Sequence, residues 1–584
     1  MGSHATPPEL ARTLVDLALD HLGRIPELVV DPSCGAGSFL LAAADALVDR
    51  GVSPAEVPRR LAGCDVDPEA VRHCRAALER WAAGHGVGTG RSTLLTDAAA
   101  QPSATEPSAT EPPTTEPFTG APTLVQLDPL RQASPFRGRA DLVVGNPPFL
   151  AQRTSDTARS AQDRLELRDR FGALGGYADD AAVFLLMASE LLSDGAVMVL
   201  VEPQSVLSTR DSAVVRGRVL RECDLIALWA DDIRYFDAQV DVCAPVMRRR
   251  ARARSHPDGD GADRPSVALH WGRDAAAVGR ADAPSLGESW APLLAASMGV
   301  PTAVPALPAA PAQEAASAPT AARAPDRWNM ADAAEMGRLI HTIDTIGDVA
   351  AVTAGFRDEF YALAAAALVE GDDGWTGAIE QLVTVGMIDV CRLDLQTPRR
   401  LGGRRVTAPR LDAEALERDA PRVARWVQAR RAPKVIVATQ TKVIEAVADP
   451  DGTLIPVTPV LSVEPLPAPT SLGPIDVWHL LAVLSAPSLA AMVARQHAGS
   501  GLSMGSFRVS AATLRSLPLP EDRSAWADGA DIAAAVQQGR LDDSDGAAGA
   551  VLLRSLGETM IRAYGSPDES LLDWWLERVP RRFR

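Results

Sequence analysis

The sequence contains few cysteines, and they are not spaced as metal ligands or as a disulfide framework. None of the six forms a CxxC pair. Structural zinc sites and disulfide scaffolds need paired or densely placed cysteines, so neither is indicated. We therefore expect reduced, partly buried thiols. The six are Cys34, Cys64, Cys74, Cys223, Cys243 and Cys391.

Long apolar runs and an excess of basic residues are also lacking. No uninterrupted apolar run reaches membrane-spanning length, and no cationic segment followed by an apolar core opens the chain. We therefore expect a soluble, cytoplasmic protein. Lysine and arginine number 58 against 75 aspartate and glutamate, a net charge of -17. This balance disfavours a uniformly basic, non-specific nucleic-acid binder but is compatible with a locally basic cleft.

The most informative stretch is residues 139–150, RADLVVGNPPFL. Leu142 to Val144 predict a short buried strand, and Gly145 ends it where a doubly wound sheet places its chemistry. Two prolines follow Asn146, so its backbone is held extended and stiff. A polar side chain is therefore expected at the carboxyl end of a strand.

The tetrad Asn146, Pro147, Pro148 and Phe149 has the groups that a flipped nucleobase requires. The Asn146 amide oxygen and the Pro147 carbonyl form a rigid acceptor pair for an exocyclic amino group, which has two hydrogens. Phe149 offers a flat apolar face that replaces lost base stacking. The alternative is a strand-ending turn followed by a core phenylalanine.

A nucleotide-type cradle is predicted earlier in the chain, in ELVVDPSCGAGSFLLAAADALV. A strand ending at Asp31 leads into a loop with Gly35 and Gly37 and then into a helix, whose first N–H groups are free. Leu40 stands where a dinucleotide fingerprint has its third glycine. Because Asp31 would repel a pyrophosphate, the loop favours a ligand carrying an ammonium or sulfonium group.

A second strand, in RLAGCDVDPEAV, ends near Asp65, whose carboxylate is placed to bind both ribose hydroxyls of a nucleotide. Asp67 is interpreted as the cap of a helix that starts at Pro68. An acid after the third strand, Asp128 or Asp97, is expected to contact the adenine of a nucleotide-type cofactor bound in this cradle. Residues 98–122, between these two, are rich in Pro, Ser, Thr and Glu and predict a disordered insertion.

These segments carry a specific resemblance to a known family. DPSCGAGSF, GCDVDPEA and DLVVGNPPF resemble motifs I, II and IV of the amino-group S-adenosylmethionine-dependent DNA methyltransferases, in the order of their gamma class. TPPELARTLVDLA, which also predicts a helix over residues 6–22, resembles motif X. The resemblance covers roughly residues 6–250. Within it, residues 177–207 are similar to the helix, turn and strand that follow the NPPF loop.

The resemblance implies a Rossmann-like α/β methyltransferase domain that binds S-adenosylmethionine and methylates a flipped adenine, with cytosine as the lesser possibility. Direct transfer would need no covalent cysteine intermediate. Phe236 is implied as a second aromatic near the base, or else as a core residue. Cofactor-binding residues implied by the motifs are Thr6, Asp31, Pro32, Cys34, Gly35, Gly37, Asp65 and Asp128; the catalytic residues are Asn146, Pro147, Pro148 and Phe149.

Beyond residue 250 the composition changes. Residues 251–327 contain one predicted strand, SVALHWGR, and an Ala/Pro-rich linker, so domains are expected to separate near residue 325. Residues 328–584 resemble, more loosely, a mixed α/β target-recognition domain that binds double-stranded DNA. Two basic clusters would contact phosphates. They are Arg399, Arg400, Arg404 and Arg405, and Arg422, Arg425, Arg430, Arg431 and Lys434.

Two alternatives remain open from the sequence. One is a protein-glutamine or RNA methyltransferase, because such enzymes also set an Asn-Pro-Pro loop against an amide or amino nitrogen. The other is a DNA-binding subunit of a defence complex with a silent cofactor pocket. No nuclease carboxylate-lysine motif, Walker loop or metal site is found, so cleavage or ATP hydrolysis would require a partner protein. The short segment before residue 6 also lacks the long helical domain expected of a type I modification subunit.

Overall fold

The computed structural model describes a large part of the chain, with gaps. The described residues are 6–87, 121–149, 166–167, 169–172, 180–209, 212–236, 240–251, 265–286, 288–301, 344–372, 379–467, 474–501, 503, 505–539, 546–566, 568 and 570–580. They divide into two compact units. Unit 1 comprises residues 1–299 and 498–504, and unit 2 comprises residues 300–497 and 505–584. The boundary predicted near residue 325, and residues 98–120 of the predicted insertion, lie outside the described residues.

Unit 1 is built on one sheet of 10 strands, nine of which follow the order β10-β9-β7-β8-β5-β4-β1-β2-β3, with β6 paired to β8. The strands are β1 (Val29–Asp31), β2 (Leu61–Asp65), β3 (Thr123–Gln126), β4 (Ala140–Gly145), β5 (Leu192–Leu200), β6 (Glu202–Pro203), β7 (Cys223–Ala230), β8 (Val242–Arg249), β9 (Ser266–Trp271) and β10 (Ala276–Asp282).

The centre of this sheet is parallel, and its strand order reverses at β1. From β1 the chain moves outward through β2 to β3 and then returns to β4 on the other side of β1. β5 continues in parallel, whereas β8 runs antiparallel between β5 and β7. Unit 1 is therefore the doubly wound α/β fold that was predicted, and ligands of such sheets bind where the order reverses.

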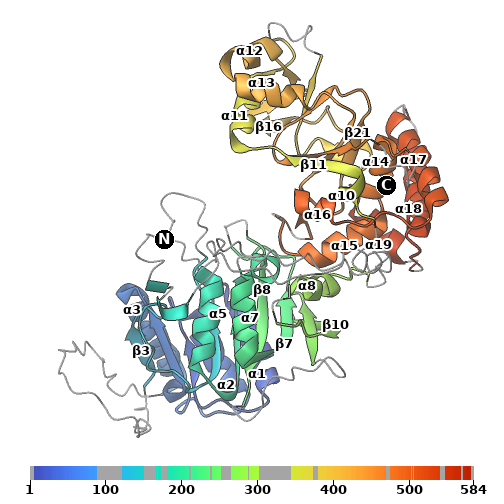
Figure 1. Cartoon of the computed structure of the whole chain (residues 1–584). Helices are drawn as coiled ribbons and strands as arrows, with labels where there is room; N and C mark the ends of the chain where they lie inside the picture. Colours follow the sequence, from blue (N-terminus) through green and yellow to red (C-terminus); the bar gives the residue numbers. More distant parts are fainter. Residues whose placement is uncertain are drawn as a thin grey trace, which may run out of the picture. The chain divides into compact units, whose positions relative to one another are not determined.

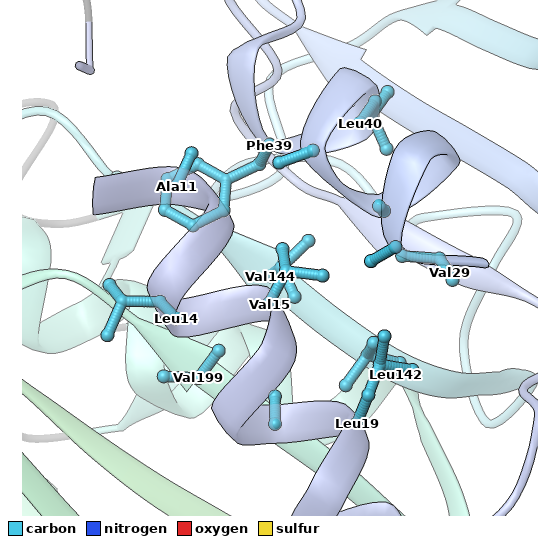
Figure 2. Close-up of a cluster of buried hydrophobic side chains, with 14 of the residues drawn as sticks. Ala11, Leu14, Val15, Leu19, Val29, Phe39, Leu40, Leu142, Val144 and Val199 are labelled. Carbon is cyan, nitrogen blue, oxygen red and sulfur yellow. The ribbon is translucent and has the colours of Figure 1, made fainter. Parts of the chain in front are cut away.

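Helices cover both faces of the sheet (Figure 1). The first helix and its neighbours share a buried cluster with alternate residues of β1, β4 and β5, because successive strand residues point to opposite faces. Figure 2 shows Leu14 and Val15 among Leu142, Val144 and Val199. The helices are α1 (Pro8–Leu22), α2 (Ser38–Asp49), α3 (Pro68–Gly84), α5 (Asp180–Leu191), α6 (Ser205–Ser208), α7 (Ala213–Glu222) and α8 (Ala291–Ser297), with a 3-10 turn at Pro58–Arg60.

Local signals explain several element ends in unit 1. Asp67 caps α3 by accepting a hydrogen bond from the Glu69 N–H at 2.9 Å, as predicted. Gly23 ends α1 in the left-handed conformation, with a φ of 72°.

A loop from the carboxyl-terminal half belongs to unit 1. Residues 498–504 are part of it, and Gly499 lies against Gln204, which follows β6. Gly499 has a φ of 79°, and a Cβ built on it would lie 2.8 Å from the Gln204 carbonyl oxygen. Only glycine permits this approach of two backbones.

Unit 2 combines small sheets with a helical region. Its sheets are β11-β23-β19-β21 and β12-β18-β13-β22, with the two-stranded pairs β14-β15, β16-β17 and β20-β24. The strands are β11 (Ala350–Ala354), β12 (Ala367–Leu368), β13 (Gln381–Val383), β14 (Ile388–Asp389), β15 (Arg392–Leu393), β16 (Arg399–Leu401), β17 (Arg404–Val406), β18 (Arg410–Leu411), β19 (Lys434–Ala438), β20 (Gln440–Thr441), β21 (Ala446–Asp449), β22 (Leu454–Pro456), β23 (Val460–Pro465) and β24 (Phe507–Arg508).

The helices of unit 2 give it the mixed α/β character that was expected. They are α10 (Ile346–Val349), α11 (Arg357–Ala365), α12 (Ala413–Asp419), α13 (Pro421–Gln428), α14 (Val477–Leu484), α15 (Pro487–His497), α16 (Ala511–Arg515), α17 (Arg523–Gln538), α18 (Gly546–Ala563) and α19 (Ser570–Arg578). Over the described ranges no single helix is long and apolar enough to cross a membrane; α14 and α15 pass that test only together, bent by 55°.

Candidate active site

The carboxyl ends of β1 and β4 meet at the point where the strand order reverses. Val30 of β1 pairs with Val143 of β4, so Asp31 and Gly145 end their strands close together. A Cβ built on Gly145 would lie only 2.8 Å from the Asp31 carboxylate oxygen Oδ1. Glycine at position 145 therefore lets the Asp31 carboxyl group sit directly against the backbone that leads into Asn146.

The Asn146 side chain is oriented by Thr6. Its amide nitrogen Nδ2 donates a hydrogen bond of 3.0 Å to the Thr6 hydroxyl, which precedes α1 and is buried. With Nδ2 engaged, the amide oxygen Oδ1 is left buried and has no hydrogen-bond partner among the described residues. Pro147 is buried and Pro148 half-buried, so the turn that holds this amide is rigid. An unpaired buried acceptor costs about 1–3 kcal/mol and is therefore a candidate ligand contact.

An aromatic pair lies next to this amide. The rings of Phe149 and Phe236 are 6.1 Å apart between centroids and nearly perpendicular, at 87°. Phe149 is half-buried against the core of unit 1, and Phe236 is buried. The structure thus brings together two aromatics separated by more than 80 residues of sequence, as an edge-to-face pair.

The glycine loop between β1 and α2 is tied to β2. The Cys34 N–H donates to the Cys64 carbonyl at 2.9 Å, and the Cys64 thiol donates to the Pro32 carbonyl at 3.4 Å. Gly35 and Gly37 have φ angles of 49° and 97°, which favour glycine. Gly37 is also the cap residue of α2 and has no side chain to occupy the first N–H groups of that helix.

Asp31 lies at the floor of this loop and is only 2% exposed. Burial, together with repulsion from Asp65, raises the pKa of Asp31 to about 8, although a hydrogen bond of 3.0 Å from the Ser33 N–H opposes the shift. The Asp31 carboxyl group is therefore largely protonated at neutral pH in the free protein. A cation placed beside it would favour the ionised form.

Asp65 closes the other side of the loop. Its carboxylate accepts hydrogen bonds from the Gly35 N–H at 2.9 Å and from the Asp67 N–H at 3.0 Å. Val66, between the two acids, is 63% exposed, which is unusual for a valine at the end of a buried strand. We did not single out Val66 from the sequence; an apolar residue between two acids at a strand end was the available signal.

Asp128 follows β3 beside Asp65, since the Leu127 N–H donates to the Asp65 carbonyl at 3.0 Å. The Asp128 carboxylate accepts from the Leu130 N–H at 3.0 Å and lies 3.5 Å from the Arg131 guanidinium. The competing residue, Asp97, lies outside the described residues.

The Cys34 thiol is not suited to act as a nucleophile. A hydrogen bond with the Cys74 thiol, reinforced by burial, raises the pKa of Cys34 far above its usual range. A thiol in this state supplies almost no thiolate at neutral pH.

These groups form one continuous edge of the sheet. The cradle of Asp31, Gly35, Gly37 and Asp65 is suited to a ribose-bearing ligand with a positive charge, and the acceptor on Asn146 is suited to a donor group beside it. The aromatic pair supplies a surface on which a planar group can stack.

Residues 1–252 match the family model described as N-6 DNA Methylase. No curated protein matches the sequence.

The solved structures that match this chain include proteins of restriction-modification systems. The type I restriction enzyme EcoKI M protein shares 18% identity over 46% of this chain and 48% of its own, with a TM-score of 0.31. A type I restriction-modification methyltransferase subunit from Streptococcus thermophilus shares 17% over 48% of this chain and 50% of its own, with a TM-score of 0.32. The type IIG restriction endonuclease BpuSI shares 14% over 100% of this chain and 67% of its own, with a TM-score of 0.41. This chain thus spans about half the length of the type I subunits, and identities this low do not indicate a shared activity.

Proposed function

Because residues 1–252 match the family model described as N-6 DNA Methylase, we propose that this chain transfers a methyl group from S-adenosylmethionine to the exocyclic amino group of a flipped adenine in duplex DNA. The observation that carries the proposal is the Asn146 amide. Its nitrogen is held by Thr6 at 3.0 Å, and its oxygen is buried without a partner among the described residues. That oxygen can accept a hydrogen bond from a ligand, and an amino group is a suitable donor.

The cofactor site fits S-adenosylmethionine in its donor chemistry. The Asp31 carboxyl group, whose pKa is raised to about 8 by burial, would face the positive sulfonium and amino end of the cofactor. Asp65 would hold the ribose hydroxyls, and exposed Val66 offers an apolar face to the adenine ring. When bound, the cofactor supplies an electrophilic methyl group. The loop is open at Gly35, where a Cβ would meet nothing within 4 Å, whereas a Cβ on Gly37 would lie 3.0 Å from the Cys74 sulfur.

The catalytic step is assigned to positioning and to hydrogen-bond acceptors. Asn146 Oδ1 and the Pro147 carbonyl accept hydrogen bonds from the two N–H groups of the adenine amino group. These hydrogen bonds draw the nitrogen lone pair out of conjugation with the ring and fix the direction of the lone pair. As positive charge develops on this nitrogen, both hydrogen bonds strengthen, so they stabilise the transition state more than the ground state. Phe149 stacks on the flipped base in place of a lost neighbour, and Phe236, perpendicular to it, supports the Phe149 ring edge-to-face.

We propose that the chain acts in restriction-modification or phage defence and that a partner protein supplies any cleavage of DNA. The acceptor geometry also suits the amide of a protein glutamine or an RNA base, so the test includes those substrates. A silent DNA-binding subunit would bind DNA and transfer nothing.

The test is transfer of labelled methyl groups to genomic DNA that lacks adenine methylation, followed by nucleoside analysis, with Asn146→Ala measured in parallel. We expect label in N6-methyladenine and a loss of at least about 100-fold in Asn146→Ala, the usual cost of removing one transition-state hydrogen-bond partner. Cofactor binding by Asn146→Ala, measured by calorimetry, should stay within about threefold of wild type. Label in RNA or protein and none in DNA, or no transfer despite cofactor binding, would contradict the proposal.

A further inference from the structure

Unit 2 contains nine basic residues that the sequence suggested as phosphate contacts, and the structure sorts them into two groups. Most of the nine are already neutralised by carboxylates. Arg399 lies 3.1 Å from Asp394 and Arg404 lies 3.6 Å from Asp372. The expectation is wrong for Lys434, which is fully buried and paired with Asp449 at 2.5 Å, because a buried ammonium needs a fixed counter-charge. Arg430 pairs with Glu464 and Arg431 with Glu380.

The hairpin β16–β17 contains two arginines that belong to the other group. Its strands are joined by Gly402 and Gly403, whose φ angles of 56° and 84° are those of a tight two-residue hairpin turn. Arg400 and Arg405 face each other directly in the register of the two strands. Both are exposed, and neither forms an ion pair with any described residue.

The hairpin is anchored by its other face. Leu401 and Val406 are each 2% exposed and belong to the hydrophobic core of unit 2. The turn also rests on α11, since a Cβ built on Gly402 would lie 2.7 Å from the Cβ of Ala364. Because successive strand residues point to opposite faces, burial of Leu401 and Val406 turns Arg400 and Arg405 outward.

Two arginines opposite each other are unfavourable for the hairpin itself. Like charges at directly paired positions destabilise a two-stranded sheet, because their Cβ atoms are only about 5 Å apart. Two neighbouring arginines that form no ion pair with any described residue are also unusual on a chain with a net charge of -17. An anionic partner that binds both guanidinium groups would remove this repulsion.

We propose that the β16–β17 hairpin is a phosphate-binding element of unit 2 that holds duplex DNA through Arg400 and Arg405; this rests on the proposed function. A guanidinium binds phosphate with two parallel hydrogen bonds. Each arginine neutralises one phosphate. The contact is independent of base sequence, so the hairpin contributes affinity and register, and does not select the target.

The experiment compares DNA binding by the full chain and by Arg400→Ala/Arg405→Ala at 50–200 mM salt. Each phosphate contact adds about 0.9 to the slope of log affinity against log salt, so the double variant should lower the magnitude of this slope by about 1.8. The ratio of wild-type to variant affinity should then shrink about 12-fold between these two salt concentrations. The loss should be the same for duplexes of unrelated sequence.

Arg404→Ala is the matched control, because it removes an exposed arginine from the same hairpin whose charge Asp372 already compensates. Its slope should stay near that of wild type, and so should the slope of Arg400→Lys/Arg405→Lys, which keeps both charges. Unchanged thermal unfolding and cofactor binding establish that the double variant is folded. An unchanged slope in the folded double variant would overturn the proposed role of the hairpin. The proposed function would still hold if the wild-type chain transfers methyl groups to DNA. Lack of wild-type transfer to DNA would instead refute the proposed function.

Discussion

Replacing Asp31 by Asn should stabilise unit 1 and weaken cofactor binding at the same time. In the free protein Asp31 is 2% exposed and accepts one hydrogen bond, from Ser33. Burial raises its pKa to about 8, whereas an unfolded aspartate titrates near 4. An asparagine has the same shape, keeps the oxygen that accepts from Ser33, and does not titrate.

The magnitude follows from proton linkage. At pH 7 the unfolded Asp31 is ionised and the folded one is largely protonated, so folding takes up a proton. This uptake begins above the unfolded pKa near 4, and pH 7 lies about 3 pH units above that pKa. At about 1.4 kcal/mol per unit, this lowers the free energy of unfolding by about 4 kcal/mol relative to a group that does not titrate. The asparagine N–H group without an acceptor offsets about 1–3 kcal/mol. We therefore expect Asp31→Asn to be more stable than wild type by about 1–3 kcal/mol at pH 7.

The sign of the pH dependence is fixed by the raised pKa. The stability of the wild type relative to Asp31→Asn should fall from about pH 4 to about pH 8, by up to about 1.4 kcal/mol per pH unit, and then become constant. The assay is urea unfolding at several pH values, followed by amide exchange of residues in β1 and β4, since the chain has two units and one global transition is not assured. Asp31→Asn less stable than wild type at pH 7, or a difference independent of pH, would mean that Asp31 is ionised in the free protein and would refute the reasoning.

Two further predictions concern the same edge of the sheet. Because a bound cation favours the ionised form of Asp31, the affinity for S-adenosylmethionine should rise by up to about tenfold per pH unit below pH 8. Binding at pH 7 should release close to one proton, which calorimetry in buffers of different ionisation enthalpy measures. Binding by Asp31→Asn should release none. Gly145→Ala would place a Cβ 2.8 Å from Asp31 Oδ1 and displace the carboxyl group, so cofactor affinity should fall about tenfold or more. The control is Gly84→Ala, in open space at the end of α3, which should bind the cofactor as wild type does. Equal binding by the two variants would show that the Gly145 contact is unimportant.

Local sequence signals were sufficient to predict the fold of unit 1. The strands ending at Asp31, Asp65 and Gly145 are short runs of β-formers, and each lies within a residue or two of its predicted place. Their common edge follows from the alternation of strands and helices, because parallel strands connected by helices bring their carboxyl ends to one side. The cap at Asp67 likewise depends on neighbouring residues only.

Contacts between distant residues could not be predicted in the same way. Nothing local indicates that Thr6 holds the Asn146 amide, that Phe149 meets Phe236, or that residues 498–504 belong to unit 1. Whether an arginine is paired also depends on carboxylates that folding brings beside it.

The sequence by itself determined the chemistry available to this protein, because strand periodicity, the glycine loop and the Asn-Pro-Pro-Phe turn are encoded by adjacent residues. Only the tertiary structure decided the raised pKa of Asp31, the burial of an Asn146 acceptor that has no partner among the described residues, and the burial of Lys434. Burial and hydrogen bonding depend on which segments surround a group, and that is set by packing across the whole unit.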